Sequence, residues 1–213
     1  MFSFIQSIST TLATSVFEEV AVILAKPAFK RAEAQYKDLN ASIATRAQSE
    51  IQLIMDELTT GTRKPNKRDE IERIHNVATS GSIKKCKRPR VDVFLVANNG
   101  VEYYIDLKTA KPNMEEFKGF KRKLLEWAAN RLAENQGANV HTLIAIPYNP
   151  YEPAPYERWT LAGLFDLPDE IRVAQEFWDW IGGKGAYIEL LAVFEQVGIE
   201  MREEIDARFA RFR

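Results

Sequence analysis

The stretch VDVFLVANNGVEYYIDLKTAKPN, residues 91–113, most constrains the fold of this chain of 213 residues. Its apolar side chains predict two β-strands, and the tripeptide at 98–100 predicts a three-residue turn with Gly100 in the left-handed conformation. That turn places Asp92 opposite Asp106 on antiparallel strands. The Cβ atoms of such a pair lie roughly 4.5–5.5 Å apart, so the carboxylates repel each other unless a cation lies between them.

Lys108 belongs to the same predicted surface. Side chains alternate along a strand, so Asp106 and Lys108 share one face while Leu107 points to the core. The alternative is a two-residue turn, which would bring Asp92 opposite Leu107 and loosen the cluster. We expect the three-residue turn, and a divalent metal ion between the two acids.

The order of the predicted elements indicates the fold class. Apolar side chains at helical spacing predict helices, and the apolar run at 140–147 predicts an interior strand. The helices are expected at 10–25, 40–58, 69–77, 114–135, 168–181 and 186–198, with a helical tail at 199–213 and loops at 62–70, 79–90 and 149–159. This order predicts an α/β fold, with a small mixed sheet flanked by helices. We expect one domain over residues 1–213, elaborated by helices at both ends.

Composition excludes several classes of protein. Lys and Arg number 29 against 30 Asp and Glu, so a site for a polyanion depends on local clustering. One cysteine excludes an internal disulfide, and with only two histidines a Cys/His zinc site or a histidine-based metal nuclease is not expected. The N-terminal 30 residues lack the pattern of a signal peptide or a membrane span. We expect a cytoplasmic protein.

The acidic hairpin resembles the PD-(D/E)XK nuclease superfamily. The matching residues are Asp92 and the triplet Asp106-Leu107-Lys108, although Val91 precedes the first aspartate and the nearest proline is displaced to Pro89. The stretches EFWDWIGGKGAYIELLAVFEQVG, DLKTAKPN and IPYNPY resemble small type II restriction endonucleases, with a likeness to the subgroup that cuts GGNCC-like or GGWCC-like sites.

This resemblance implies a mechanism. The two aspartates and the carbonyl of Leu107 would hold Mg²⁺, which polarises the scissile phosphate and lowers the pKa of a bound water. Lys108 would orient or deprotonate that water and stabilise the transition state. Glu50, on the helix predicted at 40–58, is the expected third acid; the alternative is a solvated surface glutamate.

The resemblance also implies partners. The substrate would be double-stranded DNA with a short palindromic site, bound by a homodimer, and the host would carry a cognate DNA methyltransferase. The alternatives are a repair or recombination nuclease on the same fold, or a non-catalytic nucleic-acid-binding module. Two acids facing each other across a hairpin disfavour the module, since they destabilise a surface that has no metal.

Basic and polar residues on both sides of the hairpin are candidates for DNA contacts. Five precede the first strand, Lys84, Lys85, Lys87, Arg88 and Arg90, and we expect them to bind phosphates, although a solvated loop has the same composition. Thr109 and Lys111, after the second strand, are further candidates, with a helix-capping turn as the alternative. The tyrosine-rich loop at 149–159 either reads bases or packs on the domain.

Overall fold

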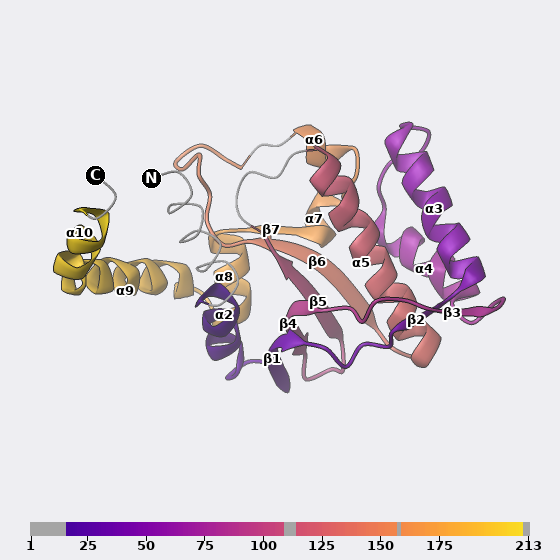
Figure 1. The fold of residues 1–213 in the computed structure, drawn as a ribbon, viewed down its shortest axis with the longest axis horizontal. Helices are drawn as coiled ribbons and strands as arrows, with labels where there is room; N and C mark the ends of the chain where they lie inside the picture. The colour runs from indigo at the N-terminus through magenta and orange to yellow at the C-terminus, as the bar shows by residue number, and fades with distance from the viewer. Residues whose placement is uncertain (1–15, 109–113, 157–158, 211–213) are drawn as a thin grey trace.

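A five-stranded mixed β-sheet forms the centre of the molecule. The computed structural model describes residues 16–108, 114–156 and 159–210, and within them the strand order is β1-β4-β5-β6-β7. The strands are β1 (Arg31–Tyr36), β4 (Val91–Val96), β5 (Glu102–Leu107), β6 (Val140–Ile146) and β7 (Ile171–Val173). The pairs β1–β4 and β4–β5 are antiparallel, whereas β5–β6 and β6–β7 are parallel (Figure 1).

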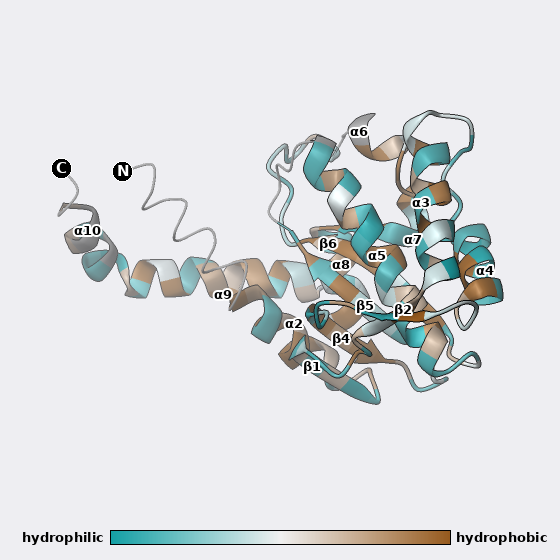
Figure 2. Ribbon diagram, turned by 45° about the vertical axis from the view of Figure 1, so that its right-hand side comes forward, coloured by the Kyte–Doolittle hydropathy of each residue, from teal (hydrophilic) through white to brown (hydrophobic). Residues whose placement is uncertain are grey.

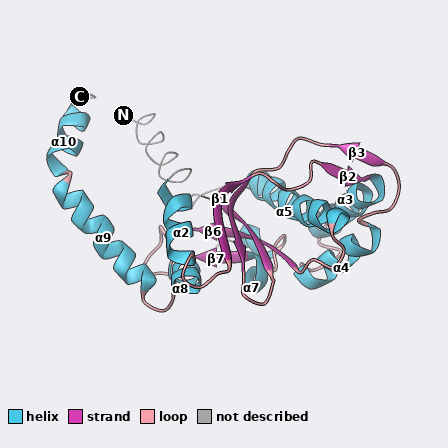
Figure 3. Cartoon of the chain, turned by 90° about the horizontal axis from the view of Figure 1, so that it is seen from below, coloured by secondary structure: helices cyan, strands magenta, loops and turns pink. Residues whose placement is uncertain are grey.

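Helices cover both faces of this sheet, so it has two hydrophobic cores. One face packs against α5 (Met114–Glu134), with α3 (Thr45–Thr59) and α4 (Lys67–Val77) beyond it. The other face packs against α2 (Phe17–Ala25) and α8 (Gln175–Gly182) (Figure 3). Alternate residues of β4 divide accordingly: Phe94 joins the first core, whereas Val93 and Leu95 join the second.

Shorter elements complete the fold. The strands β2 (Ser42–Ala44) and β3 (Ile83–Lys85) form a separate antiparallel ladder, and the single-turn helices α6 (Trp159–Ala162) and α7 (Leu167–Glu170) precede β7. The helices α9 (Ala186–Glu200) and α10 (Arg202–Ala210) extend away from the sheet (Figure 1). No helix in the described ranges combines the length and the apolar content that crossing a membrane requires.

The hairpin and its register are confirmed. Val93 pairs with Ile105 and Val96 with Glu102, and the N–H of Ala97 donates to the carbonyl of Val101 at 2.8 Å. Gly100 has φ +86°, the left-handed conformation that a three-residue turn requires. One residue beyond the pair of Val93 and Ile105, this register places Asp92 opposite Asp106. The mixed α/β class, the helix predicted at 114–135 and the strand at 140–147 are also confirmed.

Four strands, β1, β2, β3 and β7, were not expected from the sequence. No element was predicted at β1, because its sequence RAEAQY has little apolar content. At the edge of the sheet, where β1 lies, its alanines provide enough apolar surface to pack against the core. The expected loop 79–90 contains β3, which pairs with β2, so the helix expected at 40–58 begins only at Thr45. The helix expected at 168–181 is divided into α7, β7 and α8, where Ala174 has φ +47°.

A buried ionic network fixes α5 against α4 and α7. The Nζ atom of Lys121 donates to Glu70 Oε2 at 2.6 Å and to Glu170 Oε2 at 2.5 Å, and that of Lys67 donates to Glu170 Oε1 at 2.8 Å. The four side chains are between 0% and 5% exposed and carry two charges of each sign. Removing one charge would therefore leave an opposite charge buried without its partner.

We expect Lys121→Met to lower the free energy of unfolding by about 3–5 kcal/mol, because two buried glutamates lose a shared partner. Lys118→Met is the matched control on the same helix, since Lys118 pairs with the exposed Glu115, and it should cost less than about 1 kcal/mol. Urea unfolding followed by circular dichroism measures both. Equal effects of the two substitutions would contradict a structural role for the network.

Candidate active site

Two aspartates stand side by side where β4 begins and β5 ends. Asp106 is fully buried, whereas Asp92 keeps partial access to solvent. The backbone N–H of Leu107 donates to Asp92 Oδ2 at 2.9 Å. This hydrogen bond ties the first aspartate to the strand that carries the second, so both carboxyl groups are held at one end of the strand pair.

Two lysines neutralise these carboxylates. Lys108 Nζ lies 2.8 Å from Asp106 Oδ1 and 3.7 Å from Asp92 Oδ2, and it donates to the carbonyl of Leu107 at 3.0 Å. Lys123, from α5, also binds Asp106 Oδ1. The sequence motif indicated Lys108 but not Lys123, because the approach of α5 to β5 is a tertiary feature. Each ammonium also lies over an aromatic ring, Lys108 over Phe120 and Lys123 over Trp127.

The electrostatics of the pair favour a further cation. Burial, and then the neighbouring charge of Asp106, raise the pKa of Asp92. Asp106 Oδ2 is buried and has no hydrogen-bond partner within the described residues. Asp106 therefore keeps one buried carboxylate oxygen that neither Lys108 nor Lys123 binds, beside an aspartate whose charged form is disfavoured by burial. The available ligand atoms are carboxylate and carbonyl oxygens, which are the donors that Mg²⁺ prefers.

The chain itself supplies few ligands at this place. Within the described ranges, no group of three or more histidine, cysteine, aspartate or glutamate side chains is arranged to hold a metal ion. An ion here would be bound by Asp92, Asp106 and the Leu107 carbonyl, and water would complete its coordination. Mg²⁺ is commonly bound in this way, through one or two carboxylates with several waters retained.

Glu18, on α2, is a third acid near the pair. Its side chain is 2% exposed, and Arg90 Nη2 donates to its Oε1 at 3.2 Å. Burial, and then the charge of Asp92, raise the pKa of Glu18. Glu18 was not predicted from the sequence. The feature of the sequence that could have indicated it is a carboxylate within the apolar helix FEEVAVILA, because a buried acid needs a partner or a function.

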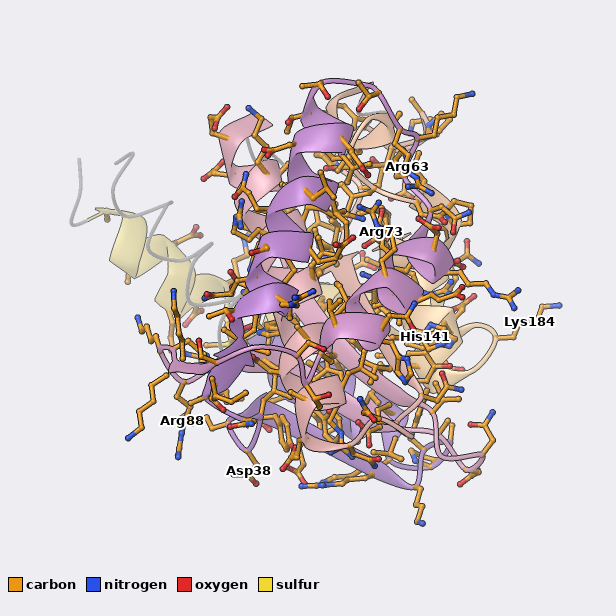
Figure 4. The ribbon with its side chains drawn as sticks, turned by 90° about the vertical axis from the view of Figure 1, so that its right-hand side faces the viewer. Asp38, Arg63, Arg73, Arg88, His141 and Lys184 are labelled. Carbon is orange, nitrogen blue, oxygen red and sulfur yellow. The ribbon has the colours of Figure 1, made fainter. Side chains whose placement is uncertain are left out.

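Glu50, the expected third acid, lies elsewhere. It is half-buried on α3, where Arg73 Nε donates to its Oε1 at 2.7 Å, and Arg73 also binds Glu57. None of the ion pairs of Glu50 within the described residues includes Asp92, Asp106 or Lys108. In Figure 4 Arg73 is well separated from Arg88, which belongs to the segment leading into β4. The structure therefore brings Glu18, and not Glu50, towards the acidic pair.

The predicted DNA-binding residues are divided between the site and its surroundings. Lys84 and Lys85 lie exposed on β3, and Lys87 and Arg88 are exposed in the segment that follows; Arg88 points outward in Figure 4. Arg90 is the member that contacts the acidic cluster of Glu18, Asp92 and Asp106, because it donates a hydrogen bond to Glu18. The remaining candidates, Thr109 and Lys111, lie outside the described residues.

Comparison with known proteins identifies the family of the chain. The model of the type II restriction endonuclease HinfI family matches residues 1–198. The chain belongs to this family. It is accordingly a type II restriction endonuclease, a site-specific deoxyribonuclease, and the expectation of a nuclease on a restriction-endonuclease-like α/β fold is confirmed. The family match does not favour the alternative of a non-catalytic module.

Two proteins similar to this chain are also type II restriction enzymes. The type II restriction enzyme HgiCII of Herpetosiphon aurantiacus is 27% identical over 206 residues, which cover 95% of this chain and 74% of the relative. The type II restriction enzyme MjaII of Methanocaldococcus jannaschii is 28% identical over 188 residues, which cover 83% of this chain and 49% of the relative. Both alignments span most of the chain.

We expect Asp92→Asn to stabilise the protein in a pH-dependent way. The pKa of Asp92 is raised in the folded state above its unfolded value of about 3.9, so the ionised form opposes folding. This cost is absent below the unfolded pKa, grows as the pH rises to the folded-state pKa, and is constant above it. The substitution should therefore raise Tm at pH 8, and the gain should shrink towards pH 4.

Thermal unfolding of wild type and Asp92→Asn between pH 4 and 8 measures this effect. Asp38→Asn, at an exposed aspartate, is the control and should change Tm little at either pH. A loss of stability in Asp92→Asn at pH 8 would contradict the electrostatic account of the pair.

Proposed function

We propose that this restriction endonuclease cleaves double-stranded DNA in a Mg²⁺-dependent reaction, and that residues 1–213 form one nuclease domain. The observation that carries the proposal is the juxtaposition of Asp92 and Asp106, with a raised pKa on the first and an unpartnered buried oxygen on the second. The two carboxylates and the Leu107 carbonyl would hold the ion. When bound, it would polarise the scissile phosphate and lower the pKa of a water molecule.

Lys108 has the chemistry to act on the attacking water. Its ammonium lies within 3.7 Å of both carboxylates and is fixed by the Leu107 carbonyl, so it is positioned before substrate arrives. An ammonium in this position orients the water and stabilises the negative charge that develops on the phosphorus oxygens. The ammonium also lies 5.0 Å from the centre of the Phe120 ring, and this cation–π contact helps to hold it in place.

We propose Glu18 as the third acid, in place of Glu50. Its buried carboxylate shares the electrostatic field of Asp92, and Arg90 orients it. With an ion bound, its carboxylate would serve as a hydrogen-bond acceptor beside the two aspartates. Glu50 is engaged by Arg73, which also binds Glu57, so it is assigned a structural role in joining α3 and α4.

The basic residues beside the site are proposed to bind the DNA backbone. Lys84, Lys85, Lys87, Arg88 and Arg90 are exposed in the stretch of chain that precedes β4, and exposed cations attract phosphates. Arg90, which binds Glu18, is the member that contacts an acid of the site. Thr109 and Lys111 remain candidates from their place in the sequence after Lys108. A companion DNA methyltransferase in the host would protect the host's own sites.

A homodimer is proposed because a palindromic site presents the same bond on both strands. The helix α9 supplies a surface for it. Only Ala186 and Tyr187 are buried on this helix, and Figure 2 shows hydrophobic residues along its length as it leaves the sheet. Five of its apolar side chains are between 42% and 68% exposed: Ile188, Leu191, Val193, Val197 and Ile199. An apolar helix that projects into solvent is typical of an interface, and the partner proposed is a second copy of this chain.

Cleavage assays test the catalytic assignments. We expect discrete fragments from a long duplex DNA only when Mg²⁺ is present. Asp106→Asn and Lys108→Met should lower the rate by roughly 10³-fold or more, since each removes a group that acts in the transition state. Glu18→Gln should lower it by about 10²-fold, whereas Glu50→Gln, the matched control, should leave it within about threefold of wild type.

An equal loss of cleavage rate in Glu18→Gln and Glu50→Gln would contradict the assignment of Glu18, rather than Glu50, as the third acid. Cleavage that is unchanged by chelation of divalent ions would contradict the metal assignment.

Light scattering after gel filtration tests the dimer. The monomer has a mass of 24.4 kDa, and we expect wild type to elute at about twice this mass. Leu191→Lys should give the monomer, because it introduces a charge into the apolar surface of α9. Leu53→Lys is the control on α3, where the leucine is similarly exposed, and it should remain dimeric. A wild-type monomer, or a dimeric Leu191→Lys, would contradict this interface.

A further inference from the structure

A cavity lies beside the acidic pair of Asp92 and Asp106, on the side of Lys123 and Arg90. It has a volume of about 400 Å³ and lies between α5 and the segment that leads into β4. Lys87, Arg88 and Arg90 line it from the segment, and Lys123, Glu126, Trp127 and Asn130 line it from α5. A nucleotide fits within this volume, and the cavity combines cationic, aromatic and amide groups, which bind phosphate, base face and base edge respectively. Glu126 is the acidic member of the lining, and burial raises the pKa of its carboxyl group.

Two residues belong to both the cavity and the acidic cluster. Lys123 binds Asp106 Oδ1, and Arg90 binds Glu18, while both line the cavity. Lys123 and Arg90 therefore lie between the cavity and the acidic residues that they bind. A strand whose phosphate lies at Asp92 and Asp106 would place a neighbouring nucleotide at the entrance of the cavity.

Asn130 is the observation that points to a ligand. It is 2% exposed, it lines the cavity, and its Oδ1 atom has no hydrogen-bond partner among the described residues. A buried amide oxygen without a partner destabilises the folded chain by about 1–3 kcal/mol. Such a cost is expected where the group binds something that is present only during function.

We propose that this cavity is a nucleotide subsite, which holds a nucleotide of the cleaved strand adjoining the scissile phosphate, and that Asn130 hydrogen-bonds the edge of its base. The phosphate binds the cationic rim formed by Lys87, Arg88 and Arg90. The base enters towards α5, where the amide can donate or accept and thereby favour some bases over others. The inference rests on the proposed function, since it takes the cleaved strand as the occupant.

The first test uses the whole protein without metal ion, so that it does not depend on cleavage. Each of the four deoxynucleoside 5′-monophosphates is titrated into ¹⁵N-labelled protein, and inorganic phosphate is titrated in parallel. The signal followed is the side-chain amide of Asn130, assigned by its absence from the spectrum of Asn130→Leu. We expect at least one nucleotide to shift this signal more than phosphate does.

A pair of variants separates binding from stability. Asn130→Leu and Thr142→Val each remove a buried polar group whose oxygen has no partner, but Thr142 lies on β6 and does not line the cavity. Both should preserve or raise Tm. Asn130→Leu should weaken nucleotide binding by about 5- to 10-fold and lower the rate of DNA cleavage, whereas Thr142→Val should change neither.

The outcomes are distinct. A selective shift of Asn130, with a stable and binding-deficient Asn130→Leu, supports the subsite. The proposal is overturned if phosphate alone shifts the Asn130 signal as much as any nucleotide, or if Asn130→Leu binds nucleotides like wild type. It is also overturned if Asn130→Leu lowers Tm while Thr142→Val does not, because Asn130 would then be structural. Failure of the wild type to cleave DNA would instead count against the proposed function. The nucleotide titration would still show whether the cavity binds nucleotides, because it does not depend on cleavage.

Discussion

The repulsion between Asp92 and Asp106 is the constraint on which the rest of the site depends. Two carboxylates on neighbouring antiparallel strands cannot both remain ionised without compensation. Lys108 and Lys123 supply it by sharing one oxygen of Asp106, and the amide of Leu107 binds Asp92. The hairpin register creates the repulsion, and the position of α5 relieves part of it. The buried network around Lys121 holds α5 in that position.

Charge is balanced across the wider cluster. The carboxylates of Glu18, Asp92 and Asp106 face the cationic groups of Arg90, Lys108 and Lys123. The cluster is thus close to neutral when all six groups are ionised, although burial raises the pKa of both Glu18 and Asp92. A divalent cation and the anionic DNA backbone that bind together would keep the cluster close to neutral, because the positive charge of the ion offsets the negative charge of the phosphates. This charge compensation explains why the acids Asp92 and Asp106 can lie beside basic residues such as Arg90 and Lys123. The chain as a whole has nearly equal numbers of acidic and basic residues.

The sequence revealed the parts of the site that depend on local geometry. The turn residues at 98–100 determined the register, and the alternation of β5 brought Asp106 and Lys108 to one face. Glu18 and Lys123 were not predicted, because they reach the site from α2 and α5, and helical spacing does not reveal which strand a helix covers. For the same reason, Glu50 was predicted as the third acid, although in the structure this helical glutamate pairs with Arg73. The edge strands β1 and β7 escaped prediction because their pairing with the sheet compensates for a weak local pattern.

The most direct test of the central claim is to locate a divalent ion by anomalous scattering from Mn²⁺, used in place of Mg²⁺ in crystals of the protein. The account predicts a peak bounded by the carboxylates of Asp92 and Asp106 and the carbonyl of Leu107, and its loss in Asp106→Asn. A peak elsewhere on the chain, or no peak while Lys108 and Lys123 remain bound to Asp106, would contradict the claim that the opposed aspartates form a metal site.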